Sequence, residues 1–339
     1  MNLKPLVRGV HAVLNGCNFF LDFLNLAKIL YDTIRSMKNF TLLVIALGHL
    51  SCAADLLSEA NYEKKVFDEP GASKSSVNFL VFGDSGTGRS QQFEVAQTMK
   101  SFCESYGCDF GVIVGDAIYE NGVDSVDDPQ FDAKFEKAYQ PLGIPLYVAL
   151  GNHDYRGNVQ AQVDYTSKSQ IWKMPERYFE ITDSALLRNT DIRAKLVVID
   201  TNDFSDNQQQ IQWFKGQLSQ ALQVNQGWRF VFGHHPLYSY GRHGPSYDLR
   251  NDLEPLICDQ VQIYFSGHEH DLQLIDTPCR YDQVVSGAAG KRRATGDAKD
   301  GDFSRSTYGF VYVRMEKSVS TIYFVDRAGD VIQRKEYRL

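Results

Sequence analysis

The stretch IVGDAIY, residues 113–119, joins the end of a short apolar run to a carboxylate and, three residues later, to a phenol. The apolar run predicts a buried strand that ends just before Asp116. The Asp116 carboxylate could bridge two metal ions, and Tyr119 could bind one of them as a phenolate, which Fe(III) favours far more than Zn(II) or Mg(II) does. We therefore expect the rest of the chain to supply further ligands to a pair of ions at this strand end.

Short apolar runs alternate with helical patterns from residue 77 onward. Strands are expected at residues 78–82, 110–114, 147–150, 196–199, 229–232 and 261–265, and helices at residues 91–103 and 208–222. Residues 309–314 and 321–326 predict an antiparallel ribbon that closes a sheet. The alternation predicts an α/β domain whose sheets are covered by helices.

Five of the predicted strands end in glycine-containing blocks of ligand-type residues. The blocks are Gly83-Asp84-Ser85-Gly86, Gly115-Asp116-Ala117-Ile118-Tyr119, Gly151-Asn152-His153-Asp154, Gly233-His234 and Gly267-His268-Glu269-His270. The carboxyl ends of strands form the ligand-binding crevice of α/β folds. Beyond residue 53, every histidine lies in or just after these blocks: His153, His234, His235, His243, His268 and His270. A lone histidine is usually structural, but this distribution predicts a metal site.

The composition is that of a globular protein, with 43% hydrophobic and 23% charged residues. The formal net charge of −7 argues against a nucleic-acid partner, which would require a basic face. A phosphate-binding site needs no overall positive charge when metal ions supply it locally.

The first 76 residues divide into three segments. Residues 1–36 are apolar but interrupted by charges, so we expect no stable membrane span and interpret them as an over-extended N-terminus, with translation starting at Met37. An amphipathic helix that lies on a membrane or on the domain is the alternative. Residues 37–53 have the pattern of a signal peptide, which predicts an exported protein, secreted or periplasmic. Residues 54–76 are interpreted as a linker and residues 77–339 as a single domain.

Four cysteines remain beyond the leader: Cys103, Cys108, Cys258 and Cys279. They allow three pairings. We favour Cys103 with Cys108, because the intervening segment is short and contains the turn-forming Gly107. Four reduced thiols packed as small apolar groups are the alternative.

The five blocks resemble those of the purple acid phosphatases, in the calcineurin-like metallophosphoesterase superfamily. The resemblance extends to two further runs, GNHDYRGNV at residues 151–159 and Arg242-His243-Gly244-Pro245. It covers the body of the chain from about Val77 onward. Within the family, the chain resembles the small, single-domain, tartrate-resistant type. Related metallophosphoesterases have Asp-x-His in the first block. Here Gly86 stands at that histidine position and Tyr119 replaces the missing ligand, which is specific to the iron-containing branch.

This resemblance implies an α-β-β-α sandwich and a binuclear Fe(III)–M(II) centre, in which M is Fe, Zn or Mn. Asp84, Tyr119 and His270 would bind Fe(III), Asp116 would bridge the ions, and Asn152, His234 and His268 would complete the divalent site. The implied activity is that of an acid phosphatase, in which a metal-bound hydroxide attacks a metal-coordinated phosphomonoester. Small phosphomonoesters are the expected substrates, with phosphotyrosine among the candidates.

His153 and His243 are the implied catalytic residues, which would orient the phosphate and protonate the leaving group. Asp154 could fix the ring of His153; a surface carboxylate is the alternative. Competing hypotheses for the function are a phosphodiesterase or nucleotide phosphatase, a non-catalytic binding module, and iron redox cycling that produces oxygen radicals.

Several positions depart from the mammalian-type pattern. Ser85 replaces tryptophan, Glu269 replaces aspartate, and His235 replaces tyrosine. None of these changes removes a ligand, but Ser85 and His235 are expected to change the pocket shape and the pH response, so the substrate preference of the family is not carried over. Lys291-Arg292-Arg293 follows a glycine-rich stretch at residues 286–290 that we expect to be flexible. These cations could reach the rim of the pocket; a solvated loop is the alternative.

The segment after Asp200-Thr201-Asn202 is short, whereas mammalian-type proteins have an exposed loop there that represses activity until it is cut. We therefore expect activity without proteolytic nicking. Phosphatase assays before and after limited trypsin digestion check this, and a large rate increase after digestion would contradict it.

Overall fold

The computed structural model describes residues 67–71, 75–188, 191–219 and 226–339, all of which fall within one compact unit. The predicted N-terminal extension, the predicted signal peptide and the predicted linker up to residue 66 lie outside the described residues. The described end of that linker contacts the domain, because the backbone N–H of Phe67 donates to the carbonyl oxygen of Val331 at 2.9 Å. Among the described helices, none has the length and apolar character needed to cross a membrane.

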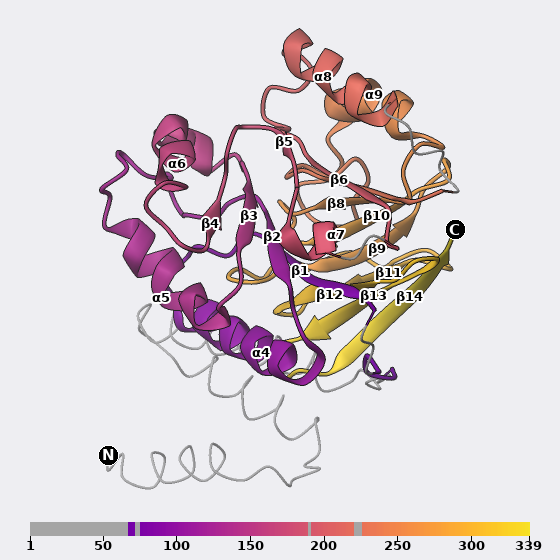
Figure 1. The fold of residues 1–339 in the computed structure, drawn as a ribbon, viewed down its shortest axis with the longest axis horizontal. Helices are drawn as coiled ribbons and strands as arrows, with labels where there is room; N and C mark the ends of the chain where they lie inside the picture. The colour runs from indigo at the N-terminus through magenta and orange to yellow at the C-terminus, as the bar shows by residue number, and fades with distance from the viewer. Residues whose placement is uncertain (1–66, 72–74, 189–190, 220–225) are drawn as a thin grey trace, which may run out of the picture. The chain divides into compact units, whose positions relative to one another are not determined.

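Two seven-stranded sheets form the centre of the described unit (Figure 1). The first has the order β14 (Val331–Arg338), β13 (Val319–Asp326), β12 (Gly309–Met315), β1 (Val77–Phe82), β2 (Phe110–Val114), β3 (Leu146–Ala149) and β4 (Trp172–Lys173). The second has the order β11 (Phe303–Arg305), β9 (Leu272–Asp276), β10 (Asp282–Ser286), β8 (Ile263–Ser266), β7 (Trp228–Phe232), β6 (Ala194–Val198) and β5 (Phe179–Glu180). The predicted ribbon is the antiparallel pair β12–β13.

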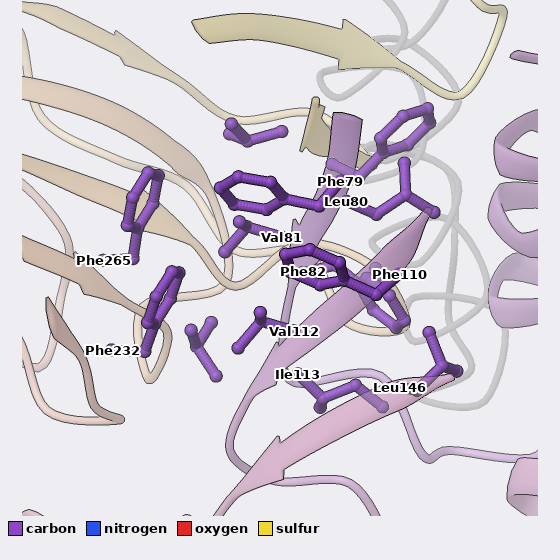
Figure 2. Close-up of a cluster of buried hydrophobic side chains, with 14 of the residues drawn as sticks. Phe79, Leu80, Val81, Phe82, Phe110, Val112, Ile113, Leu146, Phe232 and Phe265 are labelled. Carbon is purple, nitrogen blue, oxygen red and sulfur yellow. The ribbon is translucent and has the colours of Figure 1, made fainter. Parts of the chain in front are cut away.

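Side chains alternate across the central strands, so one set fills the space between the sheets and the other packs under helices. In β7, Phe230 and Phe232 belong to the inner hydrophobic cluster, whereas Val231 belongs to an outer one. The ring of Phe79 in β1 meets the ring of Phe232 edge-on, with centroids 6.3 Å apart. Figure 2 shows these rings reaching toward each other from the two sheets. The sheets therefore pack face to face over a continuous apolar layer.

Helices cover the outer faces of both sheets. Phe102 of α4 packs on Tyr312 of the first sheet, with ring centroids 5.1 Å apart. Phe214 of α8 and Leu253 of α9 join Tyr264 of β8 in the outer cluster of the second sheet. The helices are α4 (Ser90–Tyr106), η1 (Asp132–Glu136), α5 (Lys137–Tyr139), η2 (Gln140–Leu142), η3 (Asp154–Arg156), α6 (Val159–Tyr165), α7 (Ser184–Arg188), α8 (Gln208–Ser219) and α9 (Tyr247–Ile257). The predicted α-β-β-α sandwich is confirmed.

The cysteines beyond the leader form two disulfides. Cys103–Cys108 confirms the predicted pair and closes over the end of α4, where Gly107 adopts a φ of +79°. Cys258–Cys279 ties the end of α9 to the turn between β9 and β10. The alternative of four reduced thiols is wrong, and both bonds are typical of proteins in an oxidising compartment.

The expectation of a flexible stretch at residues 286–290 is also wrong. Ala288 and Ala289 are fully buried, and the N–H of Ala289 donates to the carbonyl oxygen of Gly83 at 3.3 Å. A side chain at Gly290 would collide with the backbone of Ser85. The small residues in this stretch therefore permit close packing rather than motion.

Replacing Cys258 and Cys279 together with alanine is expected to lower the free energy of unfolding by about 3 kcal/mol, against about 2 kcal/mol for Cys103 and Cys108. The reason is the longer loop closed in the unfolded chain, with a sequence separation of 21 residues rather than 5. Guanidinium denaturation of the two double variants beside the wild type measures both losses. A larger loss from opening the shorter loop would contradict this expectation.

Candidate metal centre

The predicted metal ligands lie just beyond the carboxyl ends of strands from both sheets. Asp84 follows β1, Asp116 follows β2 and His268 follows β8. These three residues have φ angles of +54°, +52° and +68°, in the left-handed region that side-chain-bearing residues rarely occupy. Asp259 is the other non-glycine residue with positive φ in the described part of the chain. The backbone strain is therefore concentrated where ligand-type side chains converge.

Glycines beside the ligands make room for the ligand of a neighbouring strand. A Cβ atom at Gly151 would lie 2.2 Å from Oδ1 of Asp116, and one at Gly115 would lie 2.3 Å from Nδ1 of His234. A Cβ atom at Gly267 would lie 2.5 Å from Oδ2 of Asp84. Any larger residue at these positions would displace a predicted ligand.

One group of ligand atoms comes from Asp84, Tyr119 and His270. The Tyr119 hydroxyl donates to Oδ1 of Asp84 at 2.9 Å and lies 3.4 Å from Nε2 of His270. Nε2 of His270 is 3.5 Å from Oδ1 of Asp84. The three atoms thus form a small triangle, with Tyr119 almost wholly buried.

A second group comes from Asn152, His234 and His268. Oδ1 of Asn152 lies 3.1 Å from Nε2 of His234 and 3.0 Å from Nδ1 of His268, and these two nitrogens are 3.3 Å apart. The Nδ1–H of His234 donates to the carbonyl oxygen of Val114 at 2.9 Å, which leaves Nε2 free as a ligand. A tetrahedral ion with bonds of about 2.1 Å has ligand atoms about 3.4 Å apart, so the triangle fits such an ion.

Asp116 lies between the two groups. Its Oδ1 is 3.5 Å from Nε2 of His234, and the Tyr119 hydroxyl is within hydrogen-bonding reach of its carboxylate. The ligand atoms of Asp84, Asp116 and His234 all lie within 4.8 Å of one another. The structure thus brings together all seven predicted ligands in an arrangement that fits two ions sharing one carboxylate.

The protonation of the ligands is set by burial and by their neighbours. Burial and the Asp116 carboxylate raise the pKa of Asp84 to about 8, although His234 opposes the shift. Burial would also raise the pKa of Asp116, but His234 and the backbone N–H of His153 outweigh it and lower that pKa. Burial, with Asp84 and Asp116, holds the pKa of Tyr119 well above its usual range. These shifts favour the protonated forms of Asp84 and Tyr119 and the ionised form of Asp116.

The imidazoles show the opposite shift. Burial and the guanidinium of Arg293 lower the pKa of His270 to about 4. Burial and neighbouring histidines lower the pKa of His268 well below its usual range. Both rings therefore stay neutral in mild acid, and neutral imidazole is the form that binds a metal.

Asp154 has neither of the roles that the sequence suggests. It is completely buried, so it is not a surface carboxylate, and its oxygens accept from the backbone N–H groups of Ala117, Ile118 and Gly151 at 2.8–3.3 Å rather than from the His153 ring. Asp154 therefore joins the loop after β2, which carries Asp116 and Tyr119, to the turn after β3. The sequence gives no signal for this, since the contacts are to backbone.

The two predicted catalytic histidines flank the ligands. The Nδ1–H of His153 donates to the carbonyl oxygen of Glu120 at 2.6 Å, and its Nε2 lies 4.0 Å from Oδ2 of Asp116. The ring of His243 lies against that of His268, with centroids 4.4 Å apart.

Glu269 holds the loop that carries His243. It is buried and accepts from the Ser239 hydroxyl at 3.0 Å and from the N–H of Gly244 at 2.7 Å. His235, another departure from the family pattern, lies with Nδ1 2.9 Å from the Thr201 hydroxyl and its ring centroid 4.8 Å from that of His268.

Two cations of the 291–293 segment reach this site, so the solvated-loop alternative is wrong for them. Nζ of Lys291 lies 3.5 Å from the centroid of the Tyr119 ring. Nη1 of Arg293 donates to Nε2 of His243 at 2.5 Å.

Sequence comparison places these residues among known proteins. The family model for calcineurin-like phosphoesterases matches residues 77–272. Purple acid phosphatase 4 of Arabidopsis thaliana is 30% identical over 287 residues, covering 76% of this chain and 83% of that protein. Human tartrate-resistant acid phosphatase type 5 is 28% identical over 293 residues, covering 75% of this chain and 88% of that protein.

Solved structures with the same fold include GAP50, the anchor in the inner membrane complex of Plasmodium, with a TM-score of 0.68 and 24% identity over 78% of this chain and 90% of that one. A purple acid phosphatase from yellow lupin seeds has a TM-score of 0.62 and 16% identity, covering 80% of this chain and 55% of that one. At these identities the structural likeness establishes the fold alone.

Metal binding is expected to release protons, because ions bind the deprotonated forms of Asp84 and Tyr119, whose raised pKa values keep both protonated at neutral pH. The apparent metal affinity should therefore fall as the pH falls. Proton release into weakly buffered solution during metal titration measures this. An affinity that stays constant from about pH 5 to about pH 8 would contradict it.

Asp154→Asn replaces a carboxylate that accepts three backbone hydrogen bonds with an amide, whose NH₂ group would face at least one of these backbone N–H donors. We expect a loss of about 1–3 kcal/mol in the free energy of unfolding and a lower metal content. Denaturation curves and metal analysis measure both effects, with Asp164→Asn, at an exposed position, as the matched control. Full metal content in Asp154→Asn would contradict the role assigned to this carboxylate.

Proposed function

Because the chain belongs to the calcineurin-like phosphoesterases, and among them to the purple and tartrate-resistant acid phosphatases, we propose that it is an exported acid phosphatase that hydrolyses small phosphomonoesters at a two-metal centre. The observation that carries this proposal is the convergence of seven ligand-type side chains into two triangles of atoms that share Asp116. Two disulfides support export.

Fe(III) is proposed for the group that contains Tyr119, and Fe, Zn or Mn as the divalent ion for the group that contains Asn152. When bound, the ions would neutralise the phosphate and supply a nucleophilic water of lowered pKa, so that the reaction can run in acid. Tyr119 distinguishes this ligand set from that of related metallophosphoesterases, which have a histidine in its place. We propose Fe(III) here because this hard ion prefers a phenolate oxygen.

His153 is proposed to meet the substrate through Nε2. Its Nδ1–H is held by the carbonyl oxygen of Glu120, which fixes the ring and directs Nε2 to the side of Asp116. In acid, a protonated Nε2 can donate to a phosphate oxygen or to the leaving group. Burial lowers the pKa of His153, so this proton is held weakly enough to be given up.

His243 is proposed to orient the phosphate through Arg293, because both of its own ring nitrogens are already hydrogen-bonded. Its Nδ1–H donates to the carbonyl oxygen of His268 at 3.1 Å, while Arg293 donates to its Nε2. Both contacts suit the neutral ring, in line with a pKa lowered by burial and by Arg293. The Arg293 guanidinium is thus held where an anionic substrate enters.

A phosphodiesterase or nucleotide phosphatase is the nearest competing function, because the same ligands could serve either ester. A non-catalytic binding module is less well supported, since such a module has no need to retain every ligand.

His153→Ala should lower kcat by about 10²-fold or more while metal content stays at the wild-type value, because Nε2 of the ring lies 4.0 Å from Oδ2 of Asp116 and Nδ1 contacts a backbone carbonyl oxygen rather than a ligand atom. Steady-state kinetics and metal analysis of the same preparation measure this. Loss of metal from His153→Ala would mean that His153 is itself a ligand.

Turnover of p-nitrophenyl phosphate is expected to exceed turnover of bis-p-nitrophenyl phosphate at acidic pH, since the monoester presents three non-bridging oxygens to the two cations and the bulkier diester presents two. Measuring kcat/KM for both esters on one metal-loaded preparation makes the comparison. A preference for the diester would favour the phosphodiesterase hypothesis instead.

A further inference from the structure

Lys291 is not a predicted metal ligand, yet its side chain lies directly beside one. Its Nζ atom lies over the face of Tyr119, 3.5 Å from the ring centroid, and 3.0 Å from Oε1 of Glu120. The Lys291 side chain is only 22% exposed. The ammonium group is therefore held against the one phenol ring among the predicted ligands.

The segment on either side of Lys291 is fixed by contacts to the site. On one side, Gly290 packs against the backbone of Ser85. On the other, the backbone N–H of Arg293 donates to the carbonyl oxygen of His270 at 2.8 Å. Lys291 is thus anchored on both sides, by a contact to Ser85, which follows the proposed iron ligand Asp84, and by a hydrogen bond to the proposed iron ligand His270.

We propose that Lys291 is an electrostatic partner of Tyr119 that stabilises its phenolate and weakens electron donation from that phenolate to Fe(III). This inference rests on the proposed function, because it requires iron at the Tyr119 group. A cation over an aromatic face is attracted to the ring electrons, and the attraction is stronger when the ring carries the negative charge of a phenolate. Lys291 would therefore place a positive charge on the face of the ring whose hydroxyl contacts Asp84.

Lowering the energy of the phenolate electrons has two measurable consequences. Transfer of an electron from phenolate to Fe(III) by light costs more energy, so the visible band of the wild type lies at shorter wavelength than it would without Lys291. The extra positive charge also favours Fe(II) over Fe(III), so the iron is easier to reduce.

The experiment compares the full-length wild type with Lys291→Met, which keeps much of the chain length but removes the charge, and Lys291→Arg, which keeps the charge. Arg292→Gln is the matched control, because Arg292 lies in the same segment but over Tyr308, 5.8 Å from that ring. Iron content, the visible spectrum and a spectroelectrochemical titration are measured on each protein.

Lys291→Met should absorb at longer wavelength, and its ratio of reduced to oxidised iron at a fixed potential should be about 2-fold to about 30-fold lower than in the wild type. Lys291→Arg and Arg292→Gln should match the wild type. Glu120→Gln removes the anion that partly neutralises Lys291, so its band should move the opposite way, to shorter wavelength; it also decides the question if Lys291→Met fails to fold.

An iron-loaded Lys291→Met protein with the band and midpoint of the wild type would overturn this inference while leaving the proposed function intact. A wild type that binds iron without a visible band would overturn both the assignment of Tyr119 as an iron ligand and the role of Lys291. Both results differ from a simple loss of activity, which plays no part in the comparison.

Discussion

Asp84 and Asp116 lie buried side by side at the ends of adjacent parallel strands, and two like charges cannot be held there without cations or protons between them. The rest of the site follows from this constraint. The strained backbone at both residues, the glycines that leave room for their oxygens, and the internal brace at Asp154 all hold the carboxylates in place. The sandwich itself brings His234 and His268 from the second sheet to face them. A bound pair of ions would relieve the repulsion that the fold imposes.

The charged and titratable groups around the two carboxylates suit a site that works at acidic pH. Buried imidazoles such as His270 stay neutral and able to bind ions at pH values where free histidine would be protonated. Lys291 and Arg293 add positive charge at the edge of the site, although the chain as a whole carries a formal charge of −7. The local field at the site is therefore decided by a few fixed cations and the proposed metals, and net charge alone says little about the substrate.

Sequence pattern was sufficient for the features that depend on local order. A strand followed by glycine and a ligand-type residue predicts a side chain at a sheet edge, and the close spacing of Cys103 and Cys108 favours their pairing. The polar edge strand β14 lacks apolar alternation and was not predicted, nor were the short strands β9, β10 and β11. The contacts of Asp154 and Glu269 reach across the chain to other loops, so no local pattern could indicate them. The cations of residues 291–293 were expected at the rim of the pocket, but the position of Lys291 over the Tyr119 ring was not. Glycine at residues 286–290 suggested flexibility, whereas tertiary packing made that stretch rigid.

In the centre that we propose, Tyr119 stands in for the histidine absent at Gly86 and so selects Fe(III) for one half of the centre. The most direct test is the visible absorption spectrum of the purified protein beside a Tyr119→Phe variant, with the metal content of both determined. We expect a broad visible band in the wild type that is lost in Tyr119→Phe. A colourless wild type with phosphatase activity and only Zn or Mn at both positions would contradict it, because Tyr119 would then have no part in choosing the metal.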